Sequence, residues 1–430
     1  MAPILLDATT DAITTNLNSL WLMVAAALVL LMTPGVAFFY GGMVKAKSVI
    51  SMMMMSFGAI ALVAVLFVLY GYSMAFSQGS GWIIRGVIGN PFASFALIPQ
   101  LTSGAGGGAN LNALAFAGFQ ATFAIITVAL ISGAIADRAR FGAWMVFAGL
   151  WVTLVYFPVA SWVFNLGPDG GWIQGALHVN DFAGGTAVHI NAGAAGLALA
   201  IVLGRRVGFA KGMVKPHNVP LTLLGASLLW FGWFGFNAGS EAAVDGVAAT
   251  AWINTLAAPA AATLGWLIVE KFKDGKATSI GAASGAVSGL VAITPACNIL
   301  TPFWGMVLGL LVGAVCAVSI DLKWRLGFDD SLDVVGIHFV GGWIGTLFIG
   351  LFGNGRGLFF GFGPASLGQQ FVGALAVTVY SFFTAALLGW IIQKTIGFRV
   401  TSEDEVAGVD TIVHGEESYV FESEEESVRA

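Results

Sequence analysis

The chain has 430 residues, of which 57% are hydrophobic and only 10% are charged, and its mean hydropathy is +0.87. Because a soluble domain carries about 25% charged residues, this composition excludes a soluble fold and predicts a polytopic membrane protein. The formal net charge of −5 is unevenly distributed: residues 401–430 hold ten acidic residues and one basic residue, whereas the remainder holds 13 acidic and 17 basic residues. We therefore expect a separate, solvated acidic tail.

Apolar runs that reach the ~20 residues needed to cross a bilayer predict eleven transmembrane helices. These runs cover residues 19–43, 49–76, 111–134, 141–164, 184–204, 218–239, 249–271, 279–298, 302–322, 333–352 and 369–396. The boundary between the eighth and ninth spans rests on Pro295 and Pro302, since proline interrupts a helix. The segment before the first span lacks a basic region ahead of an apolar one, so we expect no cleavable signal peptide.

The basic residues predict the orientation of these spans. Fifteen of them follow the odd-numbered spans: Lys45, Lys47, Arg138, Arg140, Arg205, Arg206, Lys211, Lys215, Lys271, Lys273, Lys276, Lys323, Arg325, Lys394 and Arg399. Only Arg85 and Arg356 fall on the opposite side. By the positive-inside rule the basic side is cytoplasmic, which places the N-terminus outside and the acidic tail inside.

The fifth and tenth spans share a motif. The fifth contains VHINAGAAG and the tenth contains IHFVGGWIG. The aligned pairs are His189 with His338, Gly193 with Gly342 and Gly196 with Gly345. An aspartate precedes each histidine, Asp181 by eight residues and Asp333 by five. Since five spans are an odd number, spans 1–5 and 6–10 have opposite orientations, and such inverted repeats place a transport site near the membrane midplane.

This reading divides the chain into six parts. They are a short extracellular N-terminus (1–18), a first five-helix repeat (19–204), a cytoplasmic linker (205–217), a second five-helix repeat (218–352), an outer loop with the eleventh helix (353–396), and a cytoplasmic acidic regulatory tail (397–430). The fold class is an all-α membrane protein with eleven helices in an inverted 5+5 repeat plus one.

Of the five histidines, only His189 and His338 lie deep within spans. One buried histidine alone is equally well a satisfied core residue, but a pair at equivalent repeat positions favours a transport pathway. Two imidazoles can hydrogen-bond each other and can offer donors or acceptors to a small polar solute. No third ligand is spaced for a metal, so we expect neither metal nor cofactor. Cys297 and Cys316 are expected to be buried apolar residues.

Two other features have more than one interpretation. Asp181 can cap the fifth helix, because a carboxylate accepts hydrogen bonds from the first backbone amides, or it can favour cations at a neighbouring site, and both readings stay open. Aromatic residues gather near the outer ends of several spans. They suit packing or an interfacial belt, but rings that face a pathway can also attract a cation or form a hydrophobic constriction.

Several segments resemble the ammonium transporter (Amt/Mep/Rh) family, specifically its bacterial Amt branch. They are TPGVAFFYGGMV, DRARF, DFAGGTAVHINAGAAGL, GRRVGF, KPHNVP, GWFGFNAGS, TPAC and DVVGIHFVGG, in the family's order and across essentially the whole chain. The resemblance implies a homotrimer in the cell membrane with one pore per subunit. It also implies a transporter of ammonium or ammonia, with methylammonium as an analogue, and no nucleic-acid partner. We predict no enzyme, because no HExxH, P-loop or GxSxG motif occurs in a convincing context.

The resemblance also implies roles for individual residues. In the outer vestibule, ammonium recruitment is assigned to Ser240, Phe119, Phe123, Phe164 and Trp233, and the stacked gate beneath it to Phe123 and Phe236. The pore lining is assigned to His189, His338 and Thr294, with Asp181 as a supporting carboxylate. Phe164 stands where well-known members have tryptophan, so the cation–π site is expected to be weaker or to be completed differently.

The tail bears on regulation. Residues 395–418 contain EDEVAGVDTIVHGE, which resembles the family's C-terminal regulatory segment and implies the PII signalling protein as a partner. Residues 421–430 are predicted to be a disordered acidic end. Two alternative functions stay open: an Rh-like channel for NH₃ or CO₂, and an ammonium sensor that signals through the tail.

Overall fold

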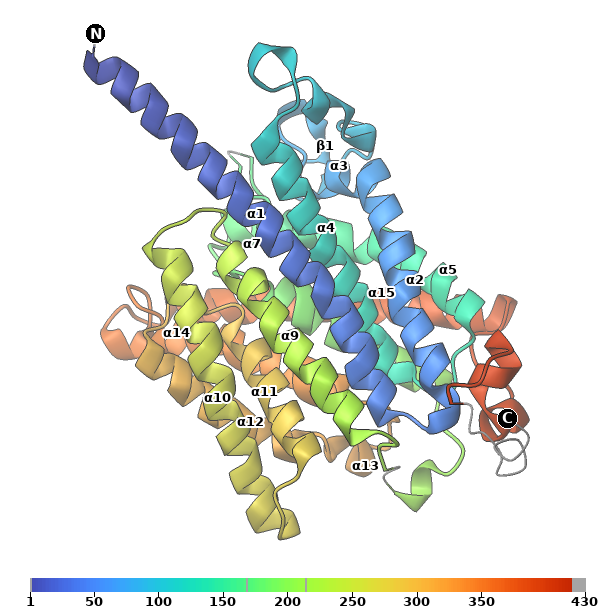
Figure 1. Cartoon of the computed structure of the whole chain (residues 1–430). Coiled ribbons are helices and arrows are strands. Elements are labelled where there is room, and N and C mark those ends of the chain that lie inside the picture. The colour runs from blue at the N-terminus through green and yellow to red at the C-terminus, as the bar shows by residue number, and fades with distance from the viewer. Residues whose placement is uncertain (1, 168, 213–214, 420–430) are drawn as a thin grey trace, which may run out of the picture.

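A computed structural model describes residues 2–167, 169–212 and 215–419, so the predicted disordered end at 421–430 lies outside the described residues. Within these ranges ten helices are long and apolar enough to cross a membrane. They are Thr10–Met43, Ala46–Ala75, Leu111–Ile135, Phe141–Phe164, Gly185–Leu203, Val219–Gly239, Gly246–Asp274, Pro302–Leu326, Val335–Phe352 and Ala365–Thr395. The prediction of a multi-pass helical membrane protein is confirmed (Figure 1).

Local hydrogen bonding divides these spans into shorter elements. The α-helices are α1 Ala2–Met43, α2 Val49–Leu66, α3 Tyr72–Ala75, α4 Leu111–Ile131, α5 Phe141–Trp151, α6 Phe157–Phe164, α7 Trp172–Gly175, α8 Asn191–Leu203, α9 Val219–Gly239, α10 Gly246–Asp274, α11 Ser279–Ile293, α12 Pro302–Ser319, α13 Leu322–Leu326, α14 Val340–Phe352, α15 Ala365–Thr395 and α16 Ser402–Ala407. The π-helical turns are η2 Phe67–Gly71, η7 Val152–Tyr156, η8 Gly185–Ile190, η10 Val335–Phe339 and η12 Asp410–His414. The 3₁₀ turns are η1 Ala46–Ser48, η3 Gly79–Gly81, η4 Phe95–Leu101, η5 Ala105–Gly107, η6 Ser132–Ile135, η9 Phe209–Lys211 and η11 Leu358–Phe360. Strands β1 Trp82–Ile84 and β2 Ile88–Gly89 form one antiparallel hairpin.

Two elements differ from the predicted spans. Helix α1 begins at Ala2 rather than near residue 19, and its 42 residues extend about 60 Å, beyond the bundle (Figure 1). The eighth span, predicted over 279–298, is the 15-residue helix α11. Pro295 cannot donate a helical hydrogen bond, and the turn that follows is held by the Asn254 amide, which donates to the carbonyls of Cys297 and Leu300 at 2.8 Å each.

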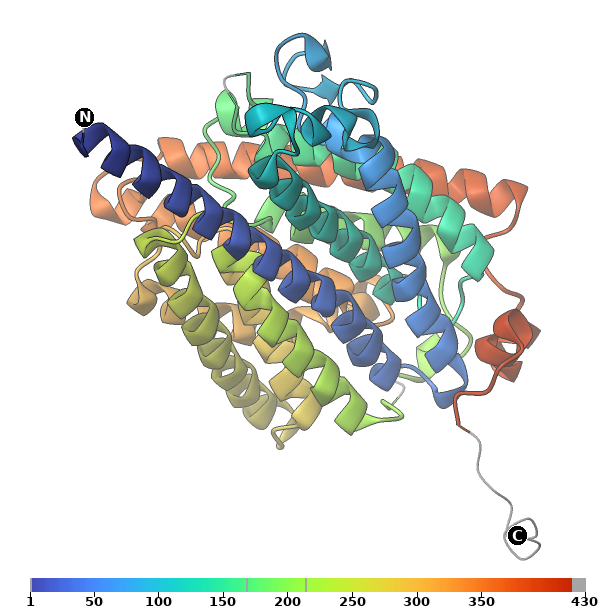
Figure 2. The ribbon, with the colours of Figure 1, turned by 45° about the horizontal axis from the view of Figure 1, so that its top comes forward.

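The first helices of the two five-helix units, α1 and α9, pack along each other (Figure 2). Small residues make this possible: a Cβ atom on Gly225 would overlap the backbone of Phe39, and one on Gly35 would lie 3.1 Å from the amide nitrogen of Leu229. Close backbone approach at glycine is typical of membrane helix pairs. On the outside of the bundle the exposed side chains are largely apolar, as with Phe231, Leu264 and Phe383, which suits contact with lipid.

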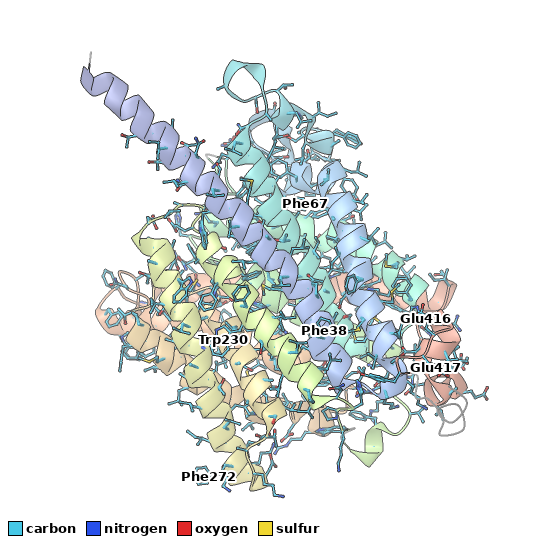
Figure 3. The ribbon with its side chains drawn as sticks, viewed as in Figure 1. Phe38, Phe67, Trp230, Phe272, Glu416 and Glu417 are labelled. Atoms are coloured by element: carbon cyan, nitrogen blue, oxygen red, sulfur yellow. The ribbon has the colours of Figure 1, made fainter. Side chains whose placement is uncertain are left out.

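The bundle has two ends of different construction, named here by the predicted orientation. The outer end carries the β1–β2 hairpin, which is tied down where the Trp162 indole donates to the Val87 carbonyl at 2.8 Å. The inner end carries exposed cationic turns and the tip of α10, where Phe272 is 87% exposed (Figure 3). The chain after α15 packs against the inner end of α2, because Asp410 accepts hydrogen bonds from the amides of Ile50 and Ser51 at 3.0 and 2.7 Å.

Candidate functional site

A cavity of about 620 Å³ opens at the outer end between α4, α6, α9 and the segment before η8. Aromatic and amide side chains line most of it. The polar residues of the lining include Gln120, Asn165, Asn180, Asp181, Ser240 and Glu241. Of the residues predicted for recruitment, Ser240 and Phe164 face this vestibule. A cavity of this size admits a hydrated small solute, so it can concentrate a substrate ahead of a narrower passage.

Below the vestibule, two phenylalanine rings close the path. Phe123 of α4 and Phe236 of α9 are stacked with centroids 4.1 Å apart and planes 6° apart, and both are fully buried. On the vestibule side, the Phe164 ring packs edge-on against the Phe123 ring, with the two ring centroids 5.9 Å apart. Phe119 packs behind Phe123 at 4.7 Å and is 1% exposed, so it supports the ring stack rather than facing the vestibule. Two stacked, fully buried rings of this kind have the geometry of a hydrophobic constriction.

The two histidines meet directly beneath this constriction. The Nδ1 atoms of His189 and His338 are 3.2 Å apart, and the rings are stacked at 24° with centroids 5.3 Å apart. They adjoin a narrow, mainly apolar cavity of about 10 Å³, which is room for about one water-sized molecule. The Nε2 atom of His189 is buried and has no hydrogen-bond partner among the described residues. The pair therefore offers unused polar capacity to a small solute in an otherwise apolar passage.

Glycines of the shared motif bring the two histidines together. A Cβ atom on Gly193 would lie 2.6 Å from the Cβ of Phe339, and one on Gly342 would lie 3.0 Å from the Cγ1 of Ile190. Phe339 and Ile190 each directly follow one of the two histidines, so the contact is reciprocal about a local two-fold axis. The repeat deduced from spacing thus corresponds to a symmetric helix crossing in space.

Trp233 and Thr294 lie on the inner side of the ring stack. The Trp233 indole stacks on His189 at 5.4 Å and 23°, and it lines the small histidine cavity, away from the vestibule for which recruitment was predicted. Thr294 is fully buried and accepts a 2.8 Å hydrogen bond from the Trp233 indole. Thr294 is not part of the cavity lining and instead orients Trp233, while its own hydroxyl bonds the Leu290 carbonyl at 2.7 Å.

Asp181 caps the π turn that carries His189. Its two carboxylate oxygens accept from the amides of Gly184, Gly185, Thr186 and Ala187 at 2.9, 2.5, 2.8 and 3.1 Å, and also from the Thr186 hydroxyl. Of the two interpretations left open for Asp181, the capping role is thus visible in the structure. With 8% exposure and five donors, this carboxylate has little capacity left for a cation.

The equivalent cap in the second repeat is Asp330, whereas the sequence comparison had paired Asp181 with Asp333. Asp330 lies eight residues before His338, the same spacing as in the first repeat, and accepts from the amides of Val334 and Val335 at 3.1 and 2.7 Å. Asp333 instead pairs with Lys323 at 2.5 Å. Burial and the neighbouring Asp333 raise the pKa of Asp330 to about 6, which Lys323 and the two amides only partly oppose.

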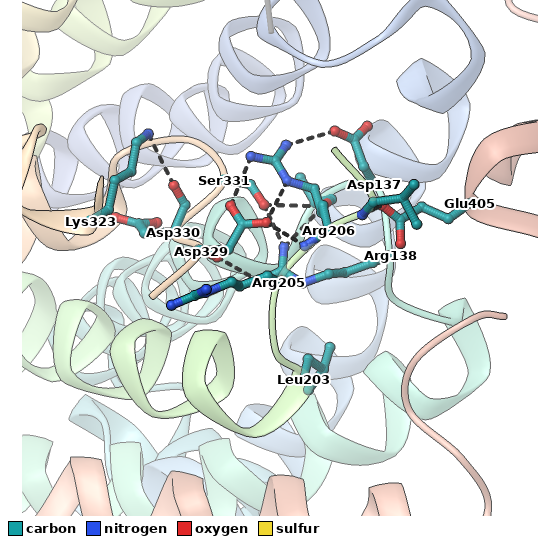
Figure 4. A network of polar contacts seen from close by, with 12 residues as sticks. Asp137, Arg138, Leu203, Arg205, Arg206, Lys323, Asp329, Asp330, Ser331 and Glu405 are labelled. Atoms are coloured by element: carbon teal, nitrogen blue, oxygen red, sulfur yellow. Dashed lines mark hydrogen bonds and ion pairs between the residues drawn. The ribbon is translucent and has the colours of Figure 1, made fainter. Parts of the chain in front are cut away.

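A polar network surrounds this second cap at the inner end (Figure 4). Arg206 binds both oxygens of Asp329 at 2.9 Å each and also binds Asp137 at 2.8 Å. Burial alone would lower the pKa of Arg206, but these two carboxylates raise it overall. Arg138, which is fully buried, donates to the Asp329 carbonyl and the Ser331 hydroxyl at 2.6 Å each. The inner cavity beside this network is about 70 Å³, far smaller than the outer vestibule.

The tail reaches the same network. Glu405 of α16 is 2% exposed, accepts from the Val207 amide at 2.6 Å and pairs with Arg399 at 2.9 Å. Val207 directly follows Arg206, the residue that binds Asp329. The segment predicted to be regulatory is therefore linked by hydrogen bonds to the turn that precedes the second histidine.

Three site residues escaped the sequence analysis: Gln120, Glu241 and Asp330. Gln120 is one polar residue in an apolar helix, and Glu241 lies in the turn after Ser240, so nothing distinguished either from packing or solvated residues. Asp330 had a usable signal, because its eight-residue spacing from His338 repeats that of Asp181 from His189. Cys297 and Cys316 are both buried, as predicted.

Comparisons with known proteins identify relatives over most of the chain. A sequence model of the Ammonium Transporter Family matches residues 20–419. The chain is 50% identical to an ammonium transporter of Mycobacterium tuberculosis, with 94% of this chain and 90% of the relative covered, and 45% identical to one of Bacillus subtilis, with 94% and 98% covered. Among solved structures it resembles a Sensor Amt Protein (TM-score 0.87, 29% identity, 94% of this chain and 100% of the other). It also resembles Mep2 of Saccharomyces cerevisiae (TM-score 0.81, 33% identity, 90% and 88% covered). The chain therefore belongs to the ammonium transporter family.

Proposed function

We propose that this protein transports ammonium across the cell membrane by admitting it as NH₄⁺ to the outer vestibule and conducting NH₃ past the two histidines. The observation that carries the proposal is the position of His189 and His338, whose Nδ1 atoms meet at 3.2 Å directly beneath a fully buried ring stack. The family and its named relatives support ammonium as the substrate.

Selectivity follows from desolvation. An ammonium ion and a potassium ion are similar in size, so a pore of fixed width separates them poorly. A bare cation entering the apolar cavity would lose its hydration without compensating charges, which is strongly unfavourable. Ammonium can shed a proton above the ring stack and continue as a neutral molecule, whereas potassium has no neutral form. The unused hydrogen-bonding capacity of the buried histidine pair then supplies partners to NH₃ within the passage.

The test is uptake of methylammonium into liposomes or into cells that lack their own carrier. We expect His189→Ala and His338→Ala each to change uptake by about tenfold or more, because each removes one half of the polar pair. The matched control is His178→Asn on an outer loop; asparagine tolerates the left-handed backbone angle of that position (φ 54°). Parental uptake in both pore variants would contradict the role of the histidine pair.

A second candidate function, ammonium sensing, is favoured by the docked tail. Glu405 and Asp410 join the tail to Val207 and to the start of α2, and one structural relative is named as a sensor. We propose that residues 401–419 regulate the pore or report its state, with a PII protein as the cytoplasmic partner and a homotrimer as the assembly. Comparing flux and signalling in a chain cut after Val400 separates the two functions: unchanged flux with lost signalling supports sensing, and lost flux supports regulation of transport.

A further inference from the structure

The outer vestibule is lined by two carboxylates, of which only one caps a helical turn. Asp181 and Glu241 are the acidic residues of the vestibule lining, and the described lining contains no lysine, arginine or histidine. Asp181 already accepts five hydrogen bonds as the cap of η8. Glu241 is half-buried, and no lysine or arginine of the described ranges lies within ion-pair distance of it. Both carboxylates give this cavity negative charge, and Glu241 is the one whose oxygens do not cap a helical turn.

The local backbone fixes Glu241 beside the predicted recruitment residue. It directly follows Ser240, whose hydroxyl donates to the backbone carbonyl of Phe236 at 2.9 Å, one turn earlier in α9. The turn after Glu241 ends at Asp245, where α10 begins, and Asp245 accepts from the amides of Val247 and Ala248 at 2.9 and 3.0 Å. Glu241 thus lies in the short connection between α9 and α10, at the vestibule lining, with its carboxyl group hydrogen-bonded to Asp245.

A second side chain of the vestibule lining also has unused hydrogen-bonding capacity. Gln120 of α4 lines the vestibule and is 7% exposed, and its Oε1 atom is buried without a partner among the described residues. A half turn of the amide exchanges its oxygen and nitrogen, so Gln120 can present an acceptor to the cavity. Buried polar groups normally find partners, and an unpartnered one that lines a cavity indicates a place for a ligand with N–H groups.

We propose that Glu241 and Gln120 form a second recruitment position in the vestibule, which binds small cations with N–H donors, such as ammonium and methylammonium, before they reach the ring stack. This inference rests on the proposed transport function and adds the residues that set its apparent affinity. Glu241 supplies the charge and Gln120 the oriented acceptor. Since both act before the constriction, they change the concentration of ammonium needed for half-maximal flux and leave the maximal rate unchanged.

The proposal has an ionic and a pH signature. Attraction by a carboxylate in an open cavity weakens as ionic strength rises, because salt screens it. Burial, followed by the charge and hydrogen bond of Asp245, raises the pKa of Glu241. The other titratable groups facing this region are Asp181, Tyr72 and the buried Cys297, none of which supplies a positive charge. Recruitment is therefore present at neutral pH and is lost as the outer pH falls through the raised pKa, while ammonium itself stays protonated throughout that range.

The experiment measures ammonium-evoked flux in liposomes containing the full chain, as a function of ammonium concentration, at low and high salt and at outer pH values from acid to neutral. The test variant is Glu241→Gln, with Glu241→Asp as the conservative replacement and Gln120→Leu as the second member of the site. The matched control is Asp11→Asn, which removes an equal charge from the exposed outer part of α1.

We expect Glu241→Gln to raise the half-saturating ammonium concentration about threefold to tenfold at low salt, with an unchanged maximal rate and no pH dependence in the acid range. Glu241→Asp should recover part of the loss, Gln120→Leu should give a smaller increase, and Asp11→Asn should match the parent. An unchanged half-saturating concentration in Glu241→Gln, or an equal increase in Asp11→Asn, overturns the inference while transport stands. Absence of ammonium flux in the parent overturns the proposed function together with the inference.

Discussion

The two histidine-bearing turns are built alike but lie in opposite surroundings. Each is a π turn capped by an aspartate eight residues before the histidine, Asp181 in one and Asp330 in the other. The first cap meets only neutral donors and borders the 620 Å³ vestibule. The second lies among Asp333, Lys323 and the Arg206 ion pairs beside a cavity of about 70 Å³. The shared construction positions the two histidines alike, whereas the surroundings differ: a large polar cavity borders the first cap, and ion pairs and a small cavity surround the second.

The sharpest way to test whether the caps fix the pore geometry is to remove one. Asp181→Ala leaves the donors of η8 without acceptors in a buried site, so we expect a loss of about 3 kcal/mol or more in the free energy of unfolding and no measurable transport. Thermal unfolding in detergent and methylammonium uptake check this. Asp181→Asn, which keeps one accepting oxygen, should be intermediate; parental stability in Asp181→Ala would show that the cap is not needed.

The reciprocal crossing of the two turns can be broken with a single methyl group. In Gly193→Ala the added Cβ would lie 2.6 Å from the Phe339 side chain and 2.7 Å from its backbone nitrogen, so the helices must separate and the histidine contact must lengthen. We expect roughly tenfold lower uptake and lower stability. Gly142→Ala in α5, where nothing lies within 4 Å, is the matched control and should be neutral or stabilising by up to about 1 kcal/mol. Equal behaviour of the two variants would contradict this account of the crossing.

The smallest expected effect is a pH dependence of stability that arises from the charged surroundings of the second cap. Because folding raises the pKa of Asp330 from 3.8 to about 6, the folded protein binds an extra proton in that interval, and the stability it contributes falls as pH rises through about 6. Asp330→Asn removes the titration while keeping one accepting oxygen. Melting temperatures of parent and variant should therefore diverge by a few degrees across this interval. Parallel pH profiles would show that Asp330 titrates normally.

The sequence predicted the fold and the centre of the site well, for physical reasons. Hydropathy and length located ten of the eleven predicted spans as long helices. The histidine pair was found because internal repetition turns one unusual residue into two. The eighth span was too long because apolar residues continue past the point where Pro295 ends the helical hydrogen bonds. Apolarity reports the membrane environment, whereas the end of a helix depends on individual backbone donors.

Other errors concern which neighbours a side chain meets. Asp333 was taken as the counterpart of Asp181 because it is the aspartate nearest to His338, but capping depends on spacing from the turn, and that spacing selects Asp330. The acidic residues at 329, 330 and 333 look equivalent in sequence. The structure distinguishes them by their partners, because Arg206 pairs with Asp329 and Lys323 pairs with Asp333. Trp233, which the resemblance assigned to the pathway, lines the cavity beside the histidines, and the buried Thr294 accepts a hydrogen bond from its indole.

The contact between the two histidines has a consequence for the direction of transport. A single proton in the hydrogen bond between the Nδ1 atoms of His189 and His338 can belong to either ring. Moving that proton alone would leave one ring anionic and the other cationic, so exchanging the donor and acceptor roles also requires a proton to pass between the two Nε2 atoms. The two neutral tautomers are near mirror images related by the local two-fold axis. Such a symmetric pair favours neither direction of ammonia movement. Net movement of ammonia through it should follow the chemical gradient in either direction, and any bias must come from the two ends of the pore.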